Sequence, residues 1–313
     1  MRLLALLLAL AVAALGCGGG DDGDAEEVTL ALDFTPNAVH AGLYAADEEG
    51  IDEEHGLELV LRPPGSSTDS LRLLQSGRAR FAVVDIHDLG LAHQAGADVV
   101  GIGAVVQRPL AAVIAGTHIR RPRQLEDARV GVTGLPSDEA VLRAVVEDDG
   151  GRYSRVRRTT IGFSAVPTLV AGRVDAVVSF WNAEGVALRQ RGFPTREFRV
   201  DAHGAPRYPE LVLATTTETL EARPGLARRV VAALREGTKE ALADEAAAVA
   251  RVARAARADR ELVLDQFRAV APALRPPLRL DLAALREWAR FDARFGILKR
   301  RPDVSELFRA PGA

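Results

Sequence analysis

Cysteine is nearly absent from this sequence: the 313-residue chain contains one, Cys17. A single thiol excludes an intramolecular disulfide and any metal site built from several cysteines. Lysine is also scarce, since only Lys239 and Lys299 occur among many arginines. The six histidines are scattered, and none forms an i, i+4 pair with an acidic partner of the kind that metalloproteases use.

Motifs for nucleotide binding and for serine hydrolysis are also missing. The sequence contains no GxxxxGK(S/T) loop, no GxGxxG directly after a predicted strand, and no GxSxG turn. The formal net charge is −3 and no basic run mixed with aromatics occurs, which argues against a nucleic-acid-binding surface. The sequence therefore predicts neither nucleotide hydrolysis nor nucleic-acid binding, and it indicates no cofactor or metal.

The first residues read as an export signal. Residues 1–17, MRLLALLLALAVAALGC, place a positive residue before an apolar run and then small residues, which is the anatomy of a secretory signal peptide. The run ends at Cys17, and this ending resembles the lipobox of bacterial lipoproteins, so we expect lipidation at Cys17. The alternative is cleavage by the ordinary signal peptidase, with Cys17 lost or idle. Residues 18–27, GGGDDGDAEE, have nothing to bury and predict a flexible tether that holds a domain off a membrane.

Strand and helix patterns alternate from residue 28 onward. Apolar runs such as VTLAL, LELVLR and VVGIGAVV are bounded by helical segments that end at glycine, as expected for an α/β fold with a parallel sheet covered on both faces. The pattern restarts near residue 116, and ELVLATT at 210–216 predicts a strand that returns to the first unit. We therefore expect lobe I over 28–114, lobe II over 115–208, and the return to lobe I with C-terminal helices over 209–313. The two crossings form a two-stranded hinge beside a ligand cleft.

Four segments carry a resemblance to a known family. LDFTPNAVHAGLYAADEEG at 32–50 resembles the opening motif of the thiamine-pyrimidine-precursor-binding proteins, which are solute-binding components of ABC importers, and of the related fungal pyrimidine synthases. FAVVDIHDL, VGVTGLPSDEAVLRAVVEDDGG and VDAVVSFWNAEGVALRQRGF follow in the family's order. The resemblance covers nearly all of the chain after the signal peptide and is weakest after residue 240.

The resemblance implies a type II periplasmic-binding-protein fold with two lobes that close on one ligand. It implies an exported, lipid-anchored monomer that binds a hydroxymethyl- or formylamino-pyrimidine and docks on an ABC permease driven by a cytoplasmic ATPase. Relatives with this fold bind alkylsulfonates, other aromatic nitrogen compounds or flavin-type rings, so another flat heterocycle or an alkylsulfonate remains the alternative ligand.

The segment SFWNAEG at 179–185 supplies the first candidate binding residues. An aminopyrimidine offers an exocyclic amine beside a basic ring nitrogen, and a carboxylate can bond both at once. Glu184 is our candidate for that role, although an acid is also favoured at a helix start for structural reasons. Trp181 offers a flat face for stacking, against the alternative of an interlobe core residue, and Asn182 stands beside it.

The remaining candidates follow two other predicted strands. In open α/β sheets ligands bind beyond the carboxyl ends of strands, and the residues at those places are Phe34, Asn37, His40, Tyr44, Asp85 and His87. Phe34 and Tyr44 would stack on the ring, but Tyr44 lies well inside a helix and is equally a core residue. Asn37 and His40 would bond the ring's polar edge, but Asn37 is also a possible N-cap. His87 is as well explained by a structural role, and capping alone explains Ser66, Ser67, Thr68 and Ser137.

An enzyme and a structural lipoprotein are the competing classes. The fungal synthases use a bound pyridoxal phosphate, which needs a lysine for its Schiff base. If His87 corresponds to their donor histidine, the lysine position four residues earlier is Val83 here. An export signal also argues against that intracellular chemistry. A purely structural or adhesive lipoprotein would not need polar and aromatic groups after several strands.

Overall fold

The computed structural model describes residues 25–65, 69–135 and 137–312. The predicted signal peptide with Cys17, most of the predicted tether, and Ser66, Ser67 and Thr68 lie outside the described residues. Within the described ranges, no helix is both long enough and apolar enough to pass through a bilayer.

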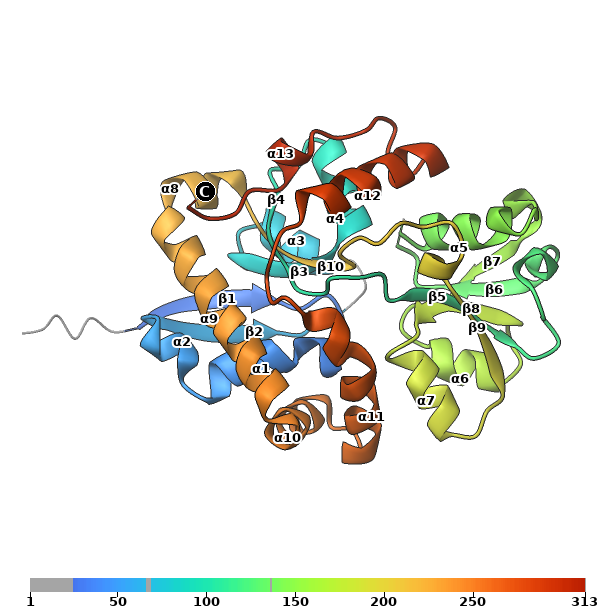
Figure 1. Ribbon diagram of the computed structural model, residues 1–313, viewed down its shortest axis with the longest axis horizontal. Coiled ribbons are helices and arrows are strands. Elements are labelled where there is room, and N and C mark those ends of the chain that lie inside the picture. The colour runs from blue at the N-terminus through green and yellow to red at the C-terminus, as the bar shows by residue number, and fades with distance from the viewer. Residues whose placement is uncertain (1–24, 66–68, 136, 313) are drawn as a thin grey trace, which may run out of the picture.

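Two lobes lie side by side, each built on a five-stranded sheet (Figure 1). The first sheet has the order β2-β1-β3-β10-β4, with β1 (Glu26–Ala31), β2 (Leu57–Arg62), β3 (Phe81–Asp85), β4 (Val100–Ala104) and β10 (Leu211–Thr215). The second has the order β7-β6-β8-β5-β9, with β5 (Ala111–Gly116), β6 (Arg129–Val132), β7 (Arg157–Thr160), β8 (Ala176–Phe180) and β9 (Thr195–Arg199). The predicted α/β two-lobed architecture is therefore confirmed.

Each sheet is mixed, whereas the sequence pattern predicted a parallel one. Strand β1 pairs in parallel with β2 and β3, but β10 runs antiparallel to β3 and β4. In the second sheet β6 is parallel to β7 and β8, but β5 is antiparallel to β8 and β9. The reversed strands are the two that enter a sheet from the other lobe, so each starts at the edge where its parallel neighbours end.

The first crossing between the lobes lies earlier than expected. The predicted boundary at 114/115 falls inside β5, which belongs to the second sheet, so the chain crosses between Val105 and Leu110. The runs that became β4 and β5 are both continuously apolar, and such runs do not say which sheet they join. The second crossing lies between β9 and β10, close to the predicted position at 208.

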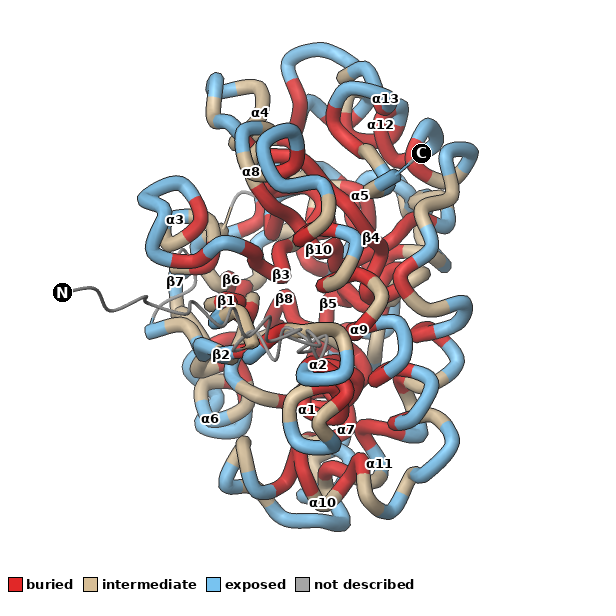
Figure 2. Tube along the Cα trace, turned by 90° about the vertical axis from the view of Figure 1, so that its left-hand side faces the viewer, coloured by how far each residue is buried: buried red, intermediate tan, exposed pale blue. Residues whose placement is uncertain are grey.

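Helices cover both sheets, and the strands at the centre of the molecule are largely buried (Figure 2). Around the first sheet lie α1 (Ala41–Glu48), α2 (Ile51–Glu54), α3 (Asp69–Gln75) and α4 (Ile86–Gln94), with the 3₁₀ turn η1 (Ala38–His40) ahead of α1. Around the second lie α5 (Ser137–Asp148), α6 (Ala165–Val170) and α7 (Glu184–Gln190), with the 3₁₀ turns η2 (Pro122–Leu125), η3 (Tyr153–Arg155) and η4 (Val200–Ala202). The C-terminal part adds α8 (Thr217–Ala222), α9 (Pro224–Ala243), α10 (Glu245–Ala256), α11 (Arg260–Val270), η5 (Ala271–Leu274), α12 (Leu282–Phe295) and α13 (Val304–Leu307).

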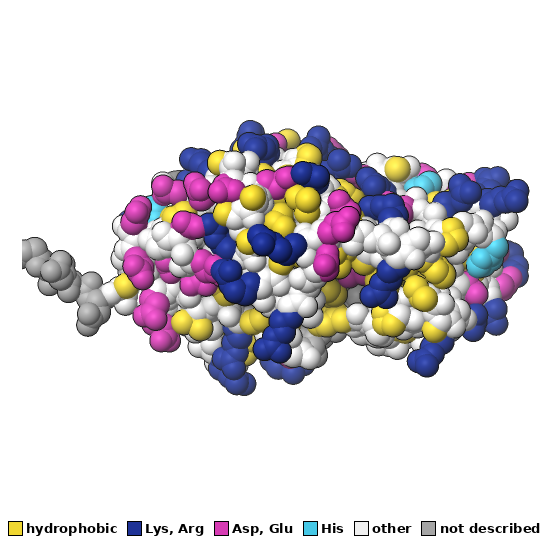
Figure 3. Space-filling model, turned by 90° about the horizontal axis from the view of Figure 1, so that it is seen from below, with side chains coloured by type: hydrophobic (Ala, Val, Ile, Leu, Met, Phe, Trp, Pro, Cys, Tyr) yellow, Lys and Arg dark blue, Asp and Glu magenta, His cyan; other side chains and the backbone are white. Residues whose placement is uncertain are grey.

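The C-terminal helices pack on both lobes. Helix α9 lies on α1, where Gly42 and Gly237 let the two backbones approach closely: a Cβ on Gly237 would stand 2.3 Å from the carbonyl oxygen of Gly42. Helix α11 contacts both η1 and α7, and α12 contacts α5. The aromatic stripe Trp288, Phe291 and Phe295 is buried, which confirms its predicted role in core packing. On the face seen in Figure 3, Lys and Arg side chains are interspersed with acidic and apolar ones.

Candidate functional site

A cavity of about 480 Å³ lies between the two lobes, within the usual size range of small-molecule sites. Residues beyond the ends of β1, β3, β6 and β8 line it, and so do the first residues of the reversed strands β5 and β10. The predicted ligand position beyond the carboxyl ends of strands therefore coincides with a real cavity.

Carboxyl groups dominate the polar lining of this cavity. They belong to Asp33, Asp85, Asp88, Asp138, Glu184 and Glu210. Among the described residues Arg72 is the one basic side chain in the lining, and it is largely exposed. No group of three or more His, Cys, Asp or Glu side chains in the described part of the chain is arranged to hold a metal ion. The cavity therefore favours a ligand with N–H donors or positive charge over an anion.

Three of these carboxyl groups occupy the amino-terminal ends of helices or the turns before them. Asp85 caps α4 by accepting the N–H of His87 at 2.8 Å. Asp138 accepts the N–H groups of Gly134 and Leu135 in the turn that leads into α5. Glu184 starts α7, and its Oε2 accepts the N–H of Phe180 at 3.1 Å. Acids at these positions satisfy free N–H groups and the positive end of each helix dipole.

Burial makes several of these groups weak acids. It raises the pKa of Asp85 to about 7, although the positive charge of His87 opposes the shift. Burial likewise raises the pKa of Glu210 to about 7, again against the effect of His87. The pKa of Asp88 lies well above its ordinary value because of burial and the neighbouring Asp85, and burial also raises the pKa of Glu184. A buried acid of this kind gains most from a ligand that offers hydrogen-bond donors.

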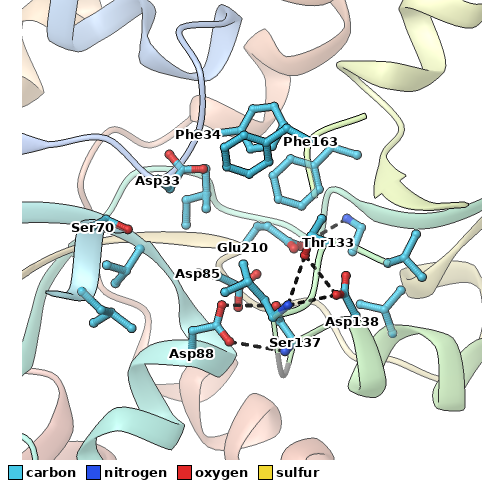
Figure 4. Close-up of a pocket in the computed structure, with 18 of the residues that line it drawn as sticks. Asp33, Phe34, Ser70, Asp85, Asp88, Thr133, Ser137, Asp138, Phe163 and Glu210 are labelled. Carbon is cyan, nitrogen blue, oxygen red and sulfur yellow. Dashed lines mark hydrogen bonds between the residues drawn. The ribbon is translucent and has the colours of Figure 1, made fainter. Parts of the chain in front are cut away.

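An aromatic pair from opposite lobes closes one side of the cavity. The ring centroids of Phe34, which follows β1, and Phe163, which precedes α6, are 4.2 Å apart and the rings meet edge to face. Figure 4 shows the two rings together above the carboxyl groups of Asp85, Asp88 and Asp138. The cavity thus combines flat apolar walls with an acidic floor, an arrangement that suits a heteroaromatic ring carrying an amine.

A second link between the lobes lies at the floor. Asp88 on α4 accepts the N–H of Ser137 on α5 at 3.3 Å, and its other oxygen bonds Ser137 Oγ at 3.2 Å. Next to Glu184, Gln266 of α11 donates to the carbonyl of Ala183, another lining residue, at 3.3 Å. These contacts hold the two lobes together around the cavity.

The family model described as NMT1/THI5 like matches residues 37–248. This chain belongs to the NMT1/THI5-like family. It is 35% identical over 226 residues to the formylaminopyrimidine-binding protein of Halalkalibacterium halodurans, a match that covers 70% of this chain and 68% of that protein. It is 22% identical over 237 residues to a 4-amino-5-hydroxymethyl-2-methylpyrimidine phosphate synthase of Saccharomyces cerevisiae, covering 70% of this chain and 68% of the synthase.

Among solved structures, the alkanesulfonate-binding protein SsuA from Xanthomonas axonopodis pv. citri bound to MOPS superposes with a TM-score of 0.74. The match covers 91% of this chain and 98% of that one at 16% identity. At this identity the likeness establishes the fold alone, which is the periplasmic-binding-protein fold.

Of the nine binding residues predicted from the sequence, the cavity is lined by Phe34, Asn37, Asp85 and Glu184. Asn37 also takes the capping role left open by the sequence, because its side chain accepts the N–H of Val39 at 3.0 Å. Its amide nitrogen donates to the carbonyl of Thr35 at 3.0 Å. Two of the four side chains, Asn37 and Asp85, therefore shape the backbone as well as the cavity wall.

The other five expected residues lie outside the lining, and each has a structural environment. His40 is fully buried; its Nε2 donates to Asp33 Oδ1 at 2.8 Å and so positions a carboxyl group that does line the cavity. Tyr44 is buried in the core between α1 and its neighbours, and burial raises its pKa to about 12. Asn182 is fully buried, and neither atom of its amide has a hydrogen-bond partner within the described residues.

Trp181 lies at the crossing between the lobes. Its indole N–H donates to the carbonyl of Pro109 at 3.2 Å, and the guanidinium groups of Arg199 and Arg108 lie over its ring at 4.1 and 5.7 Å. The ring therefore packs on cations of lobe II and the crossing, where the sequence suggested a ligand.

His87 lies behind the floor. Its Nδ1 donates to Asp292 at 2.7 Å and its Nε2 bonds the Tyr208 hydroxyl at 3.0 Å. Burial alone would lower the pKa of His87, but the negative charges of Asp292, Asp85 and Glu210 raise it to about 10. The acidic surroundings thus favour the protonated form of His87, whose positive charge partly balances the acidic floor.

Several lining residues were missed by the sequence analysis, chiefly Asp88, Asp138, Phe163 and Glu210. Asp138 follows Ser137 in the first turn of a predicted helix, where an acid is favoured for structural reasons alone. Glu210 directly precedes the apolar strand of ELVLATT. An acid that stands next to a fully apolar strand would have been a usable signal.

Proposed function

We propose that this protein is the extracytoplasmic solute-binding component of an ABC importer and that its ligand is a thiamine pyrimidine precursor. Membership of the NMT1/THI5-like family and the periplasmic-binding-protein fold support the solute-binding role. The observation that carries the ligand class is the acid-lined cavity closed by Phe34 and Phe163 between the lobes. The formylaminopyrimidine-binding relative supports the same choice.

The chemistry of an aminopyrimidine matches this lining. Its ring fits beside the aromatic pair, and its exocyclic amine offers two N–H donors to carboxyl groups on the floor. Glu184, expected from the family motif, is one candidate for the amine's partner, and Asp85 is another. A hydrogen bond that involves a charged partner contributes roughly 1.5–3 kcal/mol, so a single amine can account for a large part of the selectivity.

An alkylsulfonate is the alternative ligand, and the lining disfavours it. A sulfonate needs N–H donors, which free helix amino termini commonly supply. In this cavity the starts of α4 and α7 and the turn before α5 already hold Asp85, Glu184 and Asp138. A sulfonate placed there would meet carboxyl groups.

We propose a binding role without catalysis, although yeast relatives are named as synthases. A Schiff base requires a lysine, and both lysines, Lys239 on α9 and Lys299 after α12, are exposed and outside the lining. Val83, at the position discussed for the synthases, is buried inside β3, and His87 lies behind the cavity wall. The positions of these residues support a cavity that binds its ligand without forming a covalent bond to it.

The cellular setting is part of the proposal. The apolar N-terminal run ending at Cys17 supports export and lipid anchoring to the outer face of the cytoplasmic membrane. A permease with a cytoplasmic ATPase would be the partner, since the sequence has no nucleotide-binding loop of its own. We propose that the protein acts as a monomer.

Calorimetry on the purified protein tests the ligand class. The compounds are 4-amino-5-hydroxymethyl-2-methylpyrimidine, its formylamino counterpart, and MOPS as the sulfonate. We expect saturable binding of at least one aminopyrimidine and none of MOPS at the same concentrations. Tight binding of MOPS with no response to either pyrimidine would reject the proposed ligand and favour the sulfonate.

A further inference from the structure

Helix α11 packs on lobe I and also bonds a helix of lobe II. It contacts η1, which follows the lining residue Asn37, and α7, which begins with the lining residue Glu184. Its apolar side chains Val263 and Phe267 are buried in one core cluster with residues of both partners, and Figure 1 shows α11 beside α7. None of residues 260–270 lines the cavity, so α11 supports both walls from behind.

Two neighbouring residues of α11 bond the two ends of α7. Gln266 donates from Nε2 to the carbonyl oxygen of Ala183, the residue before α7, at 3.3 Å. Asp265 Oδ2 accepts the side-chain N–H of Gln190, the last residue of α7, at 2.7 Å. Gln266 is only 9% exposed, whereas Asp265 and Gln190 are exposed. The bond at the start of α7 is therefore the one shielded from water, and it reaches a residue of the cavity lining.

The bond to Ala183 acts on the backbone of Glu184. The carbonyl of Ala183 belongs to the planar peptide group that joins it to Glu184, so a donor that holds this oxygen also fixes the orientation of that peptide group. The same oxygen accepts the N–H of Ala187 at 3.0 Å within α7. In the side chain, Glu184 Oε2 accepts the N–H of Phe180 at 3.1 Å. Glu184 lines the cavity and keeps part of its surface exposed, so a ligand can reach it.

We propose that Gln266 is a positioning residue for ligand recognition: it holds the turn before α7 so that Glu184 meets the exocyclic amine of the bound heterocycle. This inference rests on the proposed function, and it selects Glu184 over Asp85 as the partner of the amine. Gln266 itself lies outside the lining. Because α11 packs on lobe I and Ala183 belongs to lobe II, the bond is lost when the lobes part. Closure of the lobes therefore completes the site for the amine.

Gln266→Met tests the proposal, with Gln190→Met as the matched control. Each variant removes one bond between α11 and α7 and keeps an unbranched, flexible side chain. In Gln266→Met the carbonyl of Ala183 keeps the N–H of Ala187, so the variant leaves no acceptor there without a partner. A third variant, Glu184→Gln, removes the proposed carboxylate. Calorimetry would compare 4-amino-5-hydroxymethyl-2-methylpyrimidine with its analogue lacking the amino group, on wild type and on each variant.

The measured quantity is the preference for the amino compound, which is the ratio of the two dissociation constants. A residue that acts only on closure changes both constants by the same factor and leaves this ratio unchanged. We expect Gln266→Met to reduce the preference about 2- to 13-fold, the range that corresponds to the loss of one neutral hydrogen bond, and Gln190→Met to keep it. When Glu184→Gln is already present, adding Gln266→Met should change the preference by less than about twofold, because the two residues act through one contact.

The outcomes separate this inference from the proposed function. If Gln266→Met keeps the wild-type preference, or if Gln190→Met loses as much of it, Gln266 does not position Glu184. If Glu184→Gln keeps the preference, this inference fails while the ligand class stands. If wild type binds neither compound, the proposed function and this inference both fail. Should Gln266→Met not fold, a crystal structure of the wild-type complex decides. An amine nitrogen within about 3.2 Å of a Glu184 oxygen, with Gln266 bonded to Ala183, supports the proposal, and the absence of either contact overturns it.

Discussion

Replacing Ser137 with alanine tests whether the contact between α4 and α5 helps to close the cavity. Ser137 Oγ bonds Asp88 Oδ2 at 3.2 Å across the lobes, and the variant removes this bond while keeping the backbone N–H bond to Oδ1. Burial and the nearby Asp85 raise the pKa of Asp88 well above its ordinary value. A side-chain hydrogen bond typically contributes about 0.5–1.5 kcal/mol.

This free energy applies to the equilibrium between open and closed lobes. Since about 1.4 kcal/mol corresponds to a factor of ten, Ser137→Ala should shift that equilibrium toward the open form about 2- to 13-fold. If binding requires closure, the dissociation constant for the ligand should rise by up to the same factor. The radius of gyration of the ligand-free protein in solution scattering should also increase.

Ser164→Ala is the matched control. Ser164 precedes α6, and its hydroxyl bonds the carbonyl of Ile161 within lobe II, so its loss does not touch the contact between lobes. We expect wild-type affinity and wild-type scattering for this variant. If Ser137→Ala also binds and scatters like wild type, the contact between α4 and α5 contributes nothing to closure and the reasoning is refuted.

Three further predictions follow from the buried acids, the helix contacts and the N-terminus. Because the pKa values of Asp85 and Glu210 are about 7 in the folded protein and near 4 when unfolded, the folded state keeps protons that the unfolded state has lost. The ligand-free protein should therefore lose stability as the pH rises from about 4.5 to 7. Thermal melts should show a shallower slope for Glu210→Gln, and an unchanged slope would contradict the assignment. Gly237→Ala should destabilise the protein by about 1–3 kcal/mol or more in urea, because its Cβ would stand 2.3 Å from the backbone of α1. Gly225→Ala in the same helix, with no atom closer than 3.8 Å, should be nearly neutral. Cys17→Ser should release the protein from membranes, and wild type that never incorporates labelled palmitate would argue against lipidation.

The two-lobed fold could be predicted from the sequence because its signals are local. Apolar runs, glycine stops and capping residues mark each element where it stands, and the restart near residue 116 marks a second unit. The directions of β5 and β10 could not be predicted in this way. Both are apolar runs like their neighbours, and their reversal follows from where the chain enters each sheet.

The same difference explains which binding residues were predicted. Asp85 is the last residue of a forward strand, and Phe34 and Glu184 follow two others, so the sequence rule for ligand sites applies to all three. Glu210 stands at the start of the reversed strand β10, which begins at the edge of the sheet where the forward strands end. The rule selects residues at the carboxyl ends of strands, so it does not select Glu210. Sequence alone also did not show that His87 would meet Asp292, 205 residues later, in the core.

The charge of the lining shows how one fold can serve ligands of opposite sign. A fold that brings several helix starts to one cleft offers N–H groups and positive dipole ends there, which by themselves attract anions. In this chain Asp85 bonds the N–H of His87 in the first turn of α4, while Asp138 and Glu184 stand in the first turns of α5 and α7 and bond N–H groups of the turn and strand that lead into them. Each acid places its carboxyl group at a helix start that would otherwise attract an anion, so the preference of the cleft turns from ligands that accept hydrogen bonds to ligands that donate them. A change of a few residues at helix starts would therefore be enough to change the class of ligand while the lobes, the sheets and the hinge stay as they are.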